Sequence, residues 1–200
     1  LRGHAYQKKG DSERAIRDYT EAIRLDPKHA VAYHNRGLAH HGKGDFKTAI
    51  NDYTEAIRLD PQYSEAYCNR GWSYDNRSDF ARAIADYDQA IRLQPKNAQA
   101  FNNRGWAYAR QGHLDKALAD CNEAIRIDPK LADAYDSRGF VYEKKGDLTK
   151  AIADCTEAIR LNPKYAEAYY HRATAYKRHG DKTKADRDFV RAQKLGYKPS

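Results

Sequence analysis

Asparagine recurs at one position of this sequence every 34 residues. Asn35, Asn69 and Asn103 occupy this position, and Ser137 and His171 continue the series. A primary amide both donates and accepts hydrogen bonds, so a row of such side chains suits the backbone of an extended peptide of any sequence. The alternative interpretation is that these polar residues only solvate an exposed helix face.

Large aromatic side chains recur three residues after this position. Trp72, Trp106 and Phe140 share this second column. Exposed aromatic side chains in a groove are typical of the few residues that dominate a protein interface. Aromatic residues at helical spacing also pack in cores, so packing between repeats stays open as the alternative for this strip.

A third column is basic. Arg110, Lys144 and Arg178 are also 34 residues apart, and residues 166–200 contain nine Lys and Arg against four Asp and Glu. With a net charge of +8 for the whole chain, such an edge favours an acidic ligand. Acidic residues near it weaken that field, so we do not expect nucleic acid as the main partner.

Catalysis and metal binding are not indicated. The chain has no GxGxxG, Walker, GxSxG or HExxH motif. His34 and His41 would lie about 10 Å apart along a helix, too far for one metal ion without a third ligand between them. Cys68, Cys121 and Cys155 lack CxxC spacing, and we interpret Cys121 and Cys155 as small buried groups. We therefore expect no enzyme, no cofactor and no metal site.

The segments that carry these columns repeat with the same period. In the copy from residue 30, apolar periodicity predicts helices over about 30–43 and 46–59. A glycine such as Gly44 can end the first helix, and Asp45 can cap the second. The repeating unit is therefore a helical hairpin. A proline closes each of the first five copies, at Pro27, Pro61, Pro95, Pro129 and Pro163.

Small and large residues alternate between the two helices of a hairpin. Gly37 in the first helix allows close approach, and Tyr53 in the second fills the remaining space. Ile50 and Ile57 form another apolar row, which only a neighbouring hairpin can bury. We therefore expect the hairpins to stack.

The pattern Tyr-x2-Arg-Gly-x2-Tyr, then Ala-x3-Tyr, then Pro resembles the tetratricopeptide repeat over essentially all 200 residues. The resemblance implies an all-α solenoid, a right-handed superhelix of antiparallel helix pairs whose concave groove is lined by first helices. It also implies protein or peptide partners. Asparagine ladders bind peptides in this family, and that role carries over to Asn35, Asn69 and Asn103 only. The family's carboxylate clamp is not expected, because its lysines are missing here.

This sequence departs from the family at one column. The usual Leu before the Gly is an Arg in every copy, and an Asp recurs equally often in the second helix. Because a partly buried guanidinium needs a carboxylate partner, we expect structural pairs rather than a ligand site. The two columns are Arg2, Arg36, Arg70, Arg104, Arg138, Arg172 and Asp18, Asp52, Asp86, Asp120, Asp154, Asp188.

We expect a single array, with a partial repeat at 1–29 and full repeats at 30–63, 64–97, 98–131, 132–165 and 166–199. Asp186 and Gln193 replace the stacking isoleucines in the last copy, which predicts a polar terminal cap. Because the sequence lacks Met and Leu1 falls inside a repeat, we expect a piece of a longer chain, with weak self-association through its N-terminal edge. No apolar run reaches the roughly 18 residues of a membrane span, and the cytoplasm is slightly favoured, although an upstream signal could lie outside the sequence.

The predicted function is a non-catalytic scaffold that binds an extended peptide or protein segment in its groove. The alternative is a binder of nucleic acid or another acidic polymer through the basic C-terminal half. The candidate peptide-binding residues are Asn35, Asn69, Asn103, Trp72, Trp106, Phe140 and His171, and the candidate acidic-ligand edge is Arg110, Lys144 and Arg178.

Overall fold

The computed structural model describes residues 11–198, and every element within them is a helix. The chain divides into two compact units, Leu1–Pro95 and Lys96–Ser200. The first contains α2 (Ser12–Leu25), α3 (Ala30–Gly42), α4 (Phe46–Leu59), α5 (Ser64–Asn76) and α6 (Phe80–Leu93). The second contains α7 (Ala98–Arg110), α8 (Leu114–Ile127), α9 (Ala132–Lys145), α10 (Leu148–Leu161), α11 (Ala166–His179) and α12 (Lys182–Lys194). The predicted all-α fold of helix pairs is confirmed.

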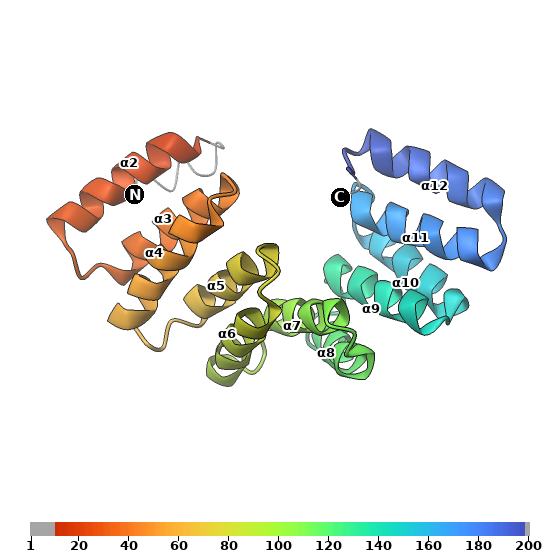
Figure 1. Cartoon of the computed structure of the whole chain (residues 1–200), viewed down its shortest axis with the longest axis horizontal. Helices are drawn as coiled ribbons and strands as arrows, with labels where there is room; N and C mark the ends of the chain where they lie inside the picture. The colour runs from red at the N-terminus through yellow and green to blue at the C-terminus, as the bar shows by residue number, and fades with distance from the viewer. Residues whose placement is uncertain (1–10, 199–200) are drawn as a thin grey trace. The chain divides into compact units, whose positions relative to one another are not determined.

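Within each unit the helices pack in chain order (Figure 1). In the first unit α3 packs on α4 and α5 on α6, and α4 also packs on α5. In the second unit the pairs are α7 with α8, α9 with α10 and α11 with α12. The first helices of successive pairs, α7, α9 and α11, also contact one another in that order. Side chains at one repeat position therefore lie on neighbouring helices.

Local signals set the helix ends as the sequence predicts. The Asp45 carboxylate accepts a hydrogen bond from the Thr48 backbone N–H at 3.1 Å, which caps α4. Gly146 and Gly180, with φ of 85° and 97°, end α9 and α11 in the left-handed conformation. Ser78 takes the equivalent turn position with φ 59°. Gly10, which has the same place in the first copy, lies outside the described residues.

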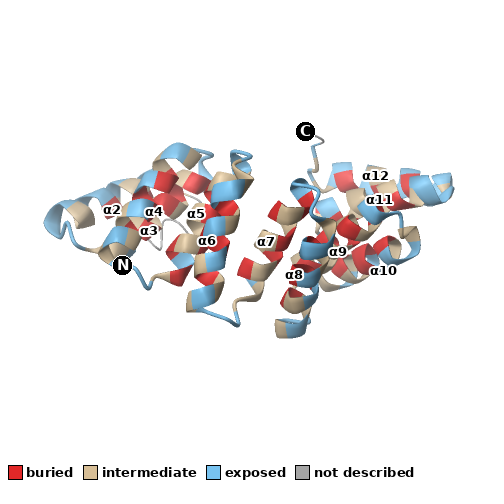
Figure 2. Cartoon of the chain, turned by 60° about the horizontal axis from the view of Figure 1, so that its bottom comes forward, coloured by how far each residue is buried: buried red, intermediate tan, exposed pale blue. Residues whose placement is uncertain are grey.

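The core of each hairpin consists of small residues facing a larger one. A Cβ atom on Gly37 would lie 2.7 Å from the Tyr53 ring, so only glycine fits there. Tyr53 is fully buried, and Cys121 and Cys155 take its place in the second unit. Cys121 and Cys155 are free and buried, as predicted, and burial raises the pKa of the Cys121 thiol to about 12. Figure 2 shows buried residues concentrated on the helix faces that point toward neighbouring helices.

The predicted Arg–Asp pairs are present in every described repeat that carries both residues. Arg36 donates to both carboxylate oxygens of Asp52, with nitrogen–oxygen distances of 2.9 and 2.7 Å. Its other terminal nitrogen donates to the Thr20 hydroxyl of the preceding repeat at 3.3 Å. Each arginine thus joins the two helices of its own pair and, where this third bond forms, the previous pair as well. The remaining pairs are Arg70–Asp86, Arg104–Asp120, Arg138–Asp154 and Arg172–Asp188.

The outer face of α12 differs from the second helices before it. Asp186 and Gln193 are exposed, in place of isoleucines such as the buried Ile50. Val190, 49% exposed, replaces the threonine that accepts a bond from the next repeat's arginine. This face is therefore more polar than the corresponding faces before it, and its role as a terminal cap stays a prediction. The N-terminal edge at Leu1 and Arg2 lies outside the described residues.

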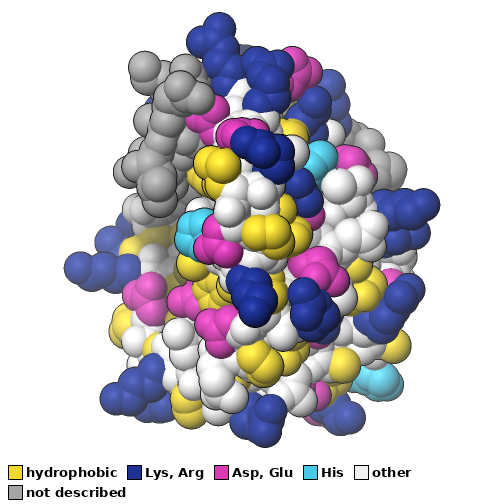
Figure 3. All heavy atoms as spheres, turned by 90° about the vertical axis from the view of Figure 1, so that its left-hand side faces the viewer, with side chains coloured by type: hydrophobic (Ala, Val, Ile, Leu, Met, Phe, Trp, Pro, Cys, Tyr) yellow, Lys and Arg dark blue, Asp and Glu magenta, His cyan; other side chains and the backbone are white. Residues whose placement is uncertain are grey.

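Charges of both signs share the surface. On the face drawn in Figure 3, Lys and Arg side chains are interspersed with Asp and Glu rather than gathered in one patch. Pairs three residues apart along a helix, such as Arg24 with Glu21 at 2.7 Å, offset part of the basic charge of the chain. Exposed pairs of this kind add little stability.

Candidate functional site

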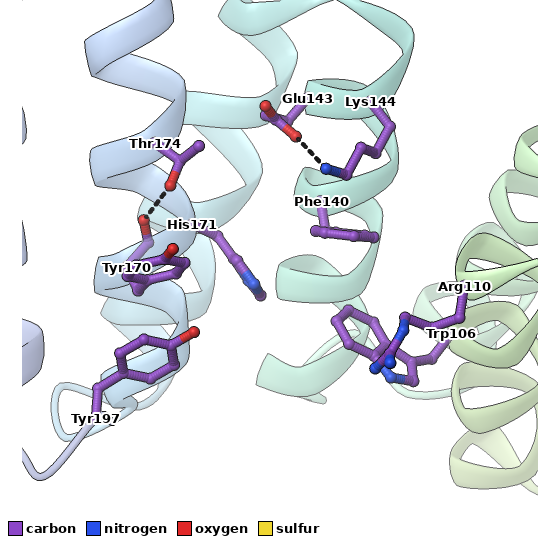
Figure 4. A pocket seen from close by; sticks show the side chains of 9 residues that line it. All are labelled: Trp106, Arg110, Phe140, Glu143, Lys144, Tyr170, His171, Thr174 and Tyr197. Atoms are coloured by element: carbon purple, nitrogen blue, oxygen red, sulfur yellow. Dashed lines mark hydrogen bonds and ion pairs between the residues drawn. The ribbon is translucent and has the colours of Figure 1, made fainter. Parts of the chain in front are cut away.

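Three first helices of the second unit together line a pocket. Trp106 lies on α7, Phe140 on α9 and His171 on α11, around a volume of about 330 Å³. Figure 4 shows side chains from these helices facing a common space, which we call the aromatic pocket. Its lining is completed by Arg110, Glu143, Lys144, Tyr170, Thr174 and Tyr197.

The pocket walls are aromatic rings in contact with one another. The ring centroids of Trp106 and Phe140 are 4.9 Å apart, and those of Phe140 and His171 are 5.3 Å apart. Tyr170 stacks on Tyr197 with centroids 4.3 Å apart and planes inclined by 23°. Such pairs contribute about 0.5–1.5 kcal/mol beyond their buried area. The walls therefore hold one another in place without a ligand.

His171 is fixed by an acidic residue beneath the pocket. Its Nδ1 lies 2.9 and 3.0 Å from the two carboxylate oxygens of Asp136, which is 3% exposed. Because a carboxylate only accepts, Nδ1 carries the hydrogen, and Nε2 is the remaining polar atom of the ring. Burial alone would lower the pKa of His171, but Asp136 outweighs it, with support from Glu167 and Glu143, so the pKa is raised. The imidazolium form is thus favoured.

Two basic side chains lie at the rim of the aromatic pocket. Lys144 and Arg110 are exposed, and the Lys144 ammonium lies 5.0 Å from the centre of the Phe140 ring. Arg178, the third predicted edge residue, donates to both the carboxylate and the backbone oxygen of Glu143, the latter at 2.7 Å. The charge of Arg178 is therefore offset by a buried acid, which also lies 3.7 Å from the Lys144 ammonium.

The predicted site residues of the first unit make contacts of their own. The Asn69 amide donates to Nε2 of His34 at 2.9 Å, and Nδ1 of His34 is 3.0 Å from the Tyr63 hydroxyl. Burial lowers the pKa of His34, in agreement with a neutral ring that accepts at Nε2. Asn35 on α3 is half-buried. Trp72 is 46% exposed and does not line the aromatic pocket.

Asn103 belongs to the second unit. Its side-chain oxygen accepts a hydrogen bond from Gln99 at 2.8 Å. The neighbouring Asn102 is 4% exposed, and its side-chain oxygen has no hydrogen-bond partner among the described residues. The amides of Asn69 and Asn103 are thus engaged inside their own units. A continuous ladder over Asn35, Asn69 and Asn103 stays a prediction.

Sequence reasoning missed two parts of the pocket. Tyr197 follows the last helix, outside the repeat pattern, and no periodic signal points to it. The pairing of Glu143 with Arg178 joins residues 35 positions apart, the same separation as Asp136 and His171. A search for opposite charges at that separation would have found both pairs.

In the described part of the chain, no group of three or more His, Cys, Asp or Glu side chains is placed to hold a metal ion. Within the same residues, no helix has the length and apolar character that crossing a bilayer requires.

Helix pairs stacked through repeated small residues define an all-helical repeat scaffold. Family models agree: tetratricopeptide repeat models match residues 68–132, 30–63 and 166–195, and a TPR repeat model matches 3–44 and 144–180. The chain belongs to the tetratricopeptide repeat family. Arrays of this family are protein-interaction scaffolds and generally non-catalytic, and none of the matching models is that of an enzyme.

Solved structures show the same fold. The MamA protein is 27% identical over 83% of this chain and 91% of its own, with a TM-score of 0.64. A tetratricopeptide repeat protein from Parabacteroides merdae is 24% identical, with a TM-score of 0.82 over 98% of this chain and 76% of its own. YrrB, described as a TPR protein with an unusual peptide-binding site, is 21% identical, with a TM-score of 0.63 over 89% and 92%. No curated protein sequence matches the chain significantly.

Proposed function

We propose that this chain binds an extended peptide or protein segment along the first helices of its repeats. The observation that carries the proposal is the aromatic pocket, where Trp106, Phe140 and His171 meet on three successive first helices. A hollow with aromatic walls and a few convergent polar groups is the usual form of an anchoring site.

The repeat fold supports this role because it presents one side chain from each first helix at regular intervals. An extended segment can thus contact α7, α9 and α11 in turn, while the Arg–Asp pairs keep the helices in place. In this arrangement the pocket anchors one side chain of the partner. The half-buried Asn103 lies one turn before Trp106 on α7, and a partner's backbone would compete with Gln99 for its side-chain oxygen.

The experiment is a selection of random peptides from a display library on the immobilised protein, followed by titration of the selected peptides. We expect Trp106→Ala to weaken binding by about 30-fold, which corresponds to about 2 kcal/mol for an aromatic anchor. Trp72→Ala is the matched comparison, because it removes the same side chain at the same repeat position in the other unit. It should weaken binding less. Equal losses in both variants would contradict a pocket-centred site.

The alternative partner, a nucleic acid or another acidic polymer, is tested with single-stranded oligothymidylate at two salt concentrations. A phosphate-dominated complex loses affinity steeply with salt and depends on Arg110 and Lys144. A peptide held by aromatic contacts loses little. Tight, strongly salt-dependent binding of the oligonucleotide, unaffected by Trp106→Ala, would replace the peptide proposal.

A further inference from the structure

The size of the aromatic pocket limits what it can hold. A volume of about 330 Å³ is near the lower end of ligand sites, which begin at about 300 Å³. That is room for one large side chain and its immediate surroundings. Trp106 and Phe140 form one wall, and Tyr170 with Tyr197 forms another. Rings on both sides favour a flat apolar side chain as the occupant.

The polar groups of the pocket favour negative charge beside that side chain. Nδ1 of His171 is bound to Asp136, whereas Nε2 has no hydrogen-bond partner among residues 11–198. When the ring is protonated, which the contact with Asp136 makes easier, this atom is a donor within the pocket. Lys144 and Arg110 add positive charge at the rim.

The acidic residues at the pocket do not reverse this preference. Glu143 lines the pocket, but its carboxylate is bound by Arg178 and lies 3.7 Å from the Lys144 ammonium. Asp136 is bound by His171. Both carboxylates are therefore neutralised by neighbours, and a cationic partner would have to compete with those neighbours for them. Glu167 also acts on His171, but it is exposed and does not line the pocket.

We propose that the aromatic pocket recognises an acidic-aromatic segment of a partner protein, in which a phenylalanine or similar ring is flanked by Asp or Glu. The ring enters between Trp106 and Tyr170, and the flanking carboxylates accept from His171 and approach Lys144 and Arg110. This inference rests on the proposed function, because it specifies the segment that the scaffold binds.

The test uses the protein's own fluorescence. The chain has two tryptophans, so Trp72→Phe leaves Trp106 as the single indole, and its emission reports occupancy of the pocket. Three synthetic peptides are titrated into this variant, with central sequences Glu-Phe-Glu, Gln-Phe-Gln and Glu-Ala-Glu in a Gly-Ser frame. We expect Glu-Phe-Glu to change the emission and to bind at least about fivefold more tightly than Gln-Phe-Gln, as two exposed charge contacts provide. Replacing Phe by Ala should cost at least about tenfold.

A matched pair of lysine variants separates a local contact from overall charge. Lys144 lines the pocket, whereas its neighbour Lys145 pairs with Asp115 at 2.6 Å, away from it. In the same background, Lys144→Gln should weaken Glu-Phe-Glu by about two- to fivefold and leave Gln-Phe-Gln unchanged. Lys145→Gln should alter neither.

Failure of this inference is distinct from failure of the proposed function. Library peptides that bind in a Trp106-dependent manner, combined with equal affinities for Glu-Phe-Glu and Gln-Phe-Gln, would overturn the acidic preference alone. Equal effects of Lys144→Gln and Lys145→Gln would likewise overturn it. If no library peptide binds at all, the proposed function fails together with the inference.

Discussion

The two units make a contact between the same two repeat positions, but with different residues. In the first unit Asn69 donates to a neutral His34, and in the second His171 donates to the carboxylate of Asp136. Both contacts join residues 35 positions apart, so the repeat brings equivalent backbone positions together in each case. The comparison shows that the backbone of the repeat fixes which positions meet, whereas the residues at those positions decide whether the contact is neutral or ionic.

The aromatic column differs between the units in the same way. In the first unit, Trp72 lies against His41, with ring centroids 4.0 Å apart, and stays 46% exposed. In the second unit, Trp106 lies against Phe140 and lines a pocket. The pocket of the second unit thus lies where two successive repeats both supply a ring, and one of its lining residues, His171, is bound to Asp136.

The largest difference should appear when the donor of each contact is removed. His171→Ala leaves the buried Asp136 carboxylate without its partner, which should cost about 3 kcal/mol of unfolding free energy. Asn69→Ala leaves only a neutral ring with one bond fewer, and should cost about 1 kcal/mol. Urea unfolding of both variants measures the two losses.

His171→Asn is the control for this prediction. It supplies the amide that the first unit uses at this position, and the amide can still donate to Asp136. We expect it to recover part of the loss. If His171→Ala and Asn69→Ala unfold at the same urea concentration, the contact between His171 and Asp136 is no stronger than the neutral contact in the first unit.

Loss of an Arg–Asp pair should lower the unfolding free energy by the same amount in both units, unlike loss of the His contact. Arg70→Leu in the first unit and Arg138→Leu in the second each leave a largely buried carboxylate, Asp86 or Asp154. Each change should cost about 2 kcal/mol. Replacing the partner Asp by Leu as well should restore much of the stability. A wild-type urea midpoint for either single variant would show that its arginine contributes nothing.

Columns that vary little made the fold predictable. The Arg–Asp pairs follow from two columns that are identical in every copy, and the close approach at Gly37 and the Asp45 cap follow from columns that keep their residue in most copies. The site was only partly predictable, because its residues vary from repeat to repeat. Trp106 and Phe140 were found from their spacing, but their spacing alone also indicated Trp72, which lies outside the pocket. Whether a ring faces a hollow also depends on other lining residues, and some of these, such as Tyr197, follow no period.

Acid should act on the two units in opposite directions. The pKa of His34 and of His41 is lowered by burial from the usual 6.5. These residues add stability above pH 6.5, and it is lost as the pH falls through their folded-state pKa values. The pKa of His171 is raised, because Asp136, with Glu167 and Glu143, outweighs the effect of burial. Its contribution is complete below pH 6.5 and is lost as the pH rises through the raised value.

Hydrogen exchange measured about one pH unit on either side of 6.5 tests this opposition. After correction for the intrinsic exchange rate, amides of α3 and α5 should become less protected at the lower pH, and those of α9 and α11 at the higher pH. The effect is smaller than removal of a partner, since protonation changes one charge and leaves the packing in place. Parallel changes in the two units would contradict the assignment of a neutral His34 and a charged His171.

The last prediction concerns two tyrosines, one in each unit, that pack against equivalent positions of a first helix. Tyr63, which precedes α5, lies against His34 with ring centroids 4.8 Å apart, and Tyr197, which follows α12, stacks on Tyr170 at 4.3 Å. His34 and Tyr170 occupy the same repeat position, so a tyrosine beside the helix pair covers this position in both units. Tyr197→Ala removes one stacked pair and should weaken both the protection of α11 and the binding of the Glu-Phe-Glu peptide by about 1 kcal/mol. Tyr197→Phe keeps the ring and should behave as the wild type in hydrogen exchange and in the Trp106 titration. If Tyr197→Ala instead strengthens peptide binding, the ring is an occupant of the pocket rather than its wall, because its removal then frees space that the peptide uses.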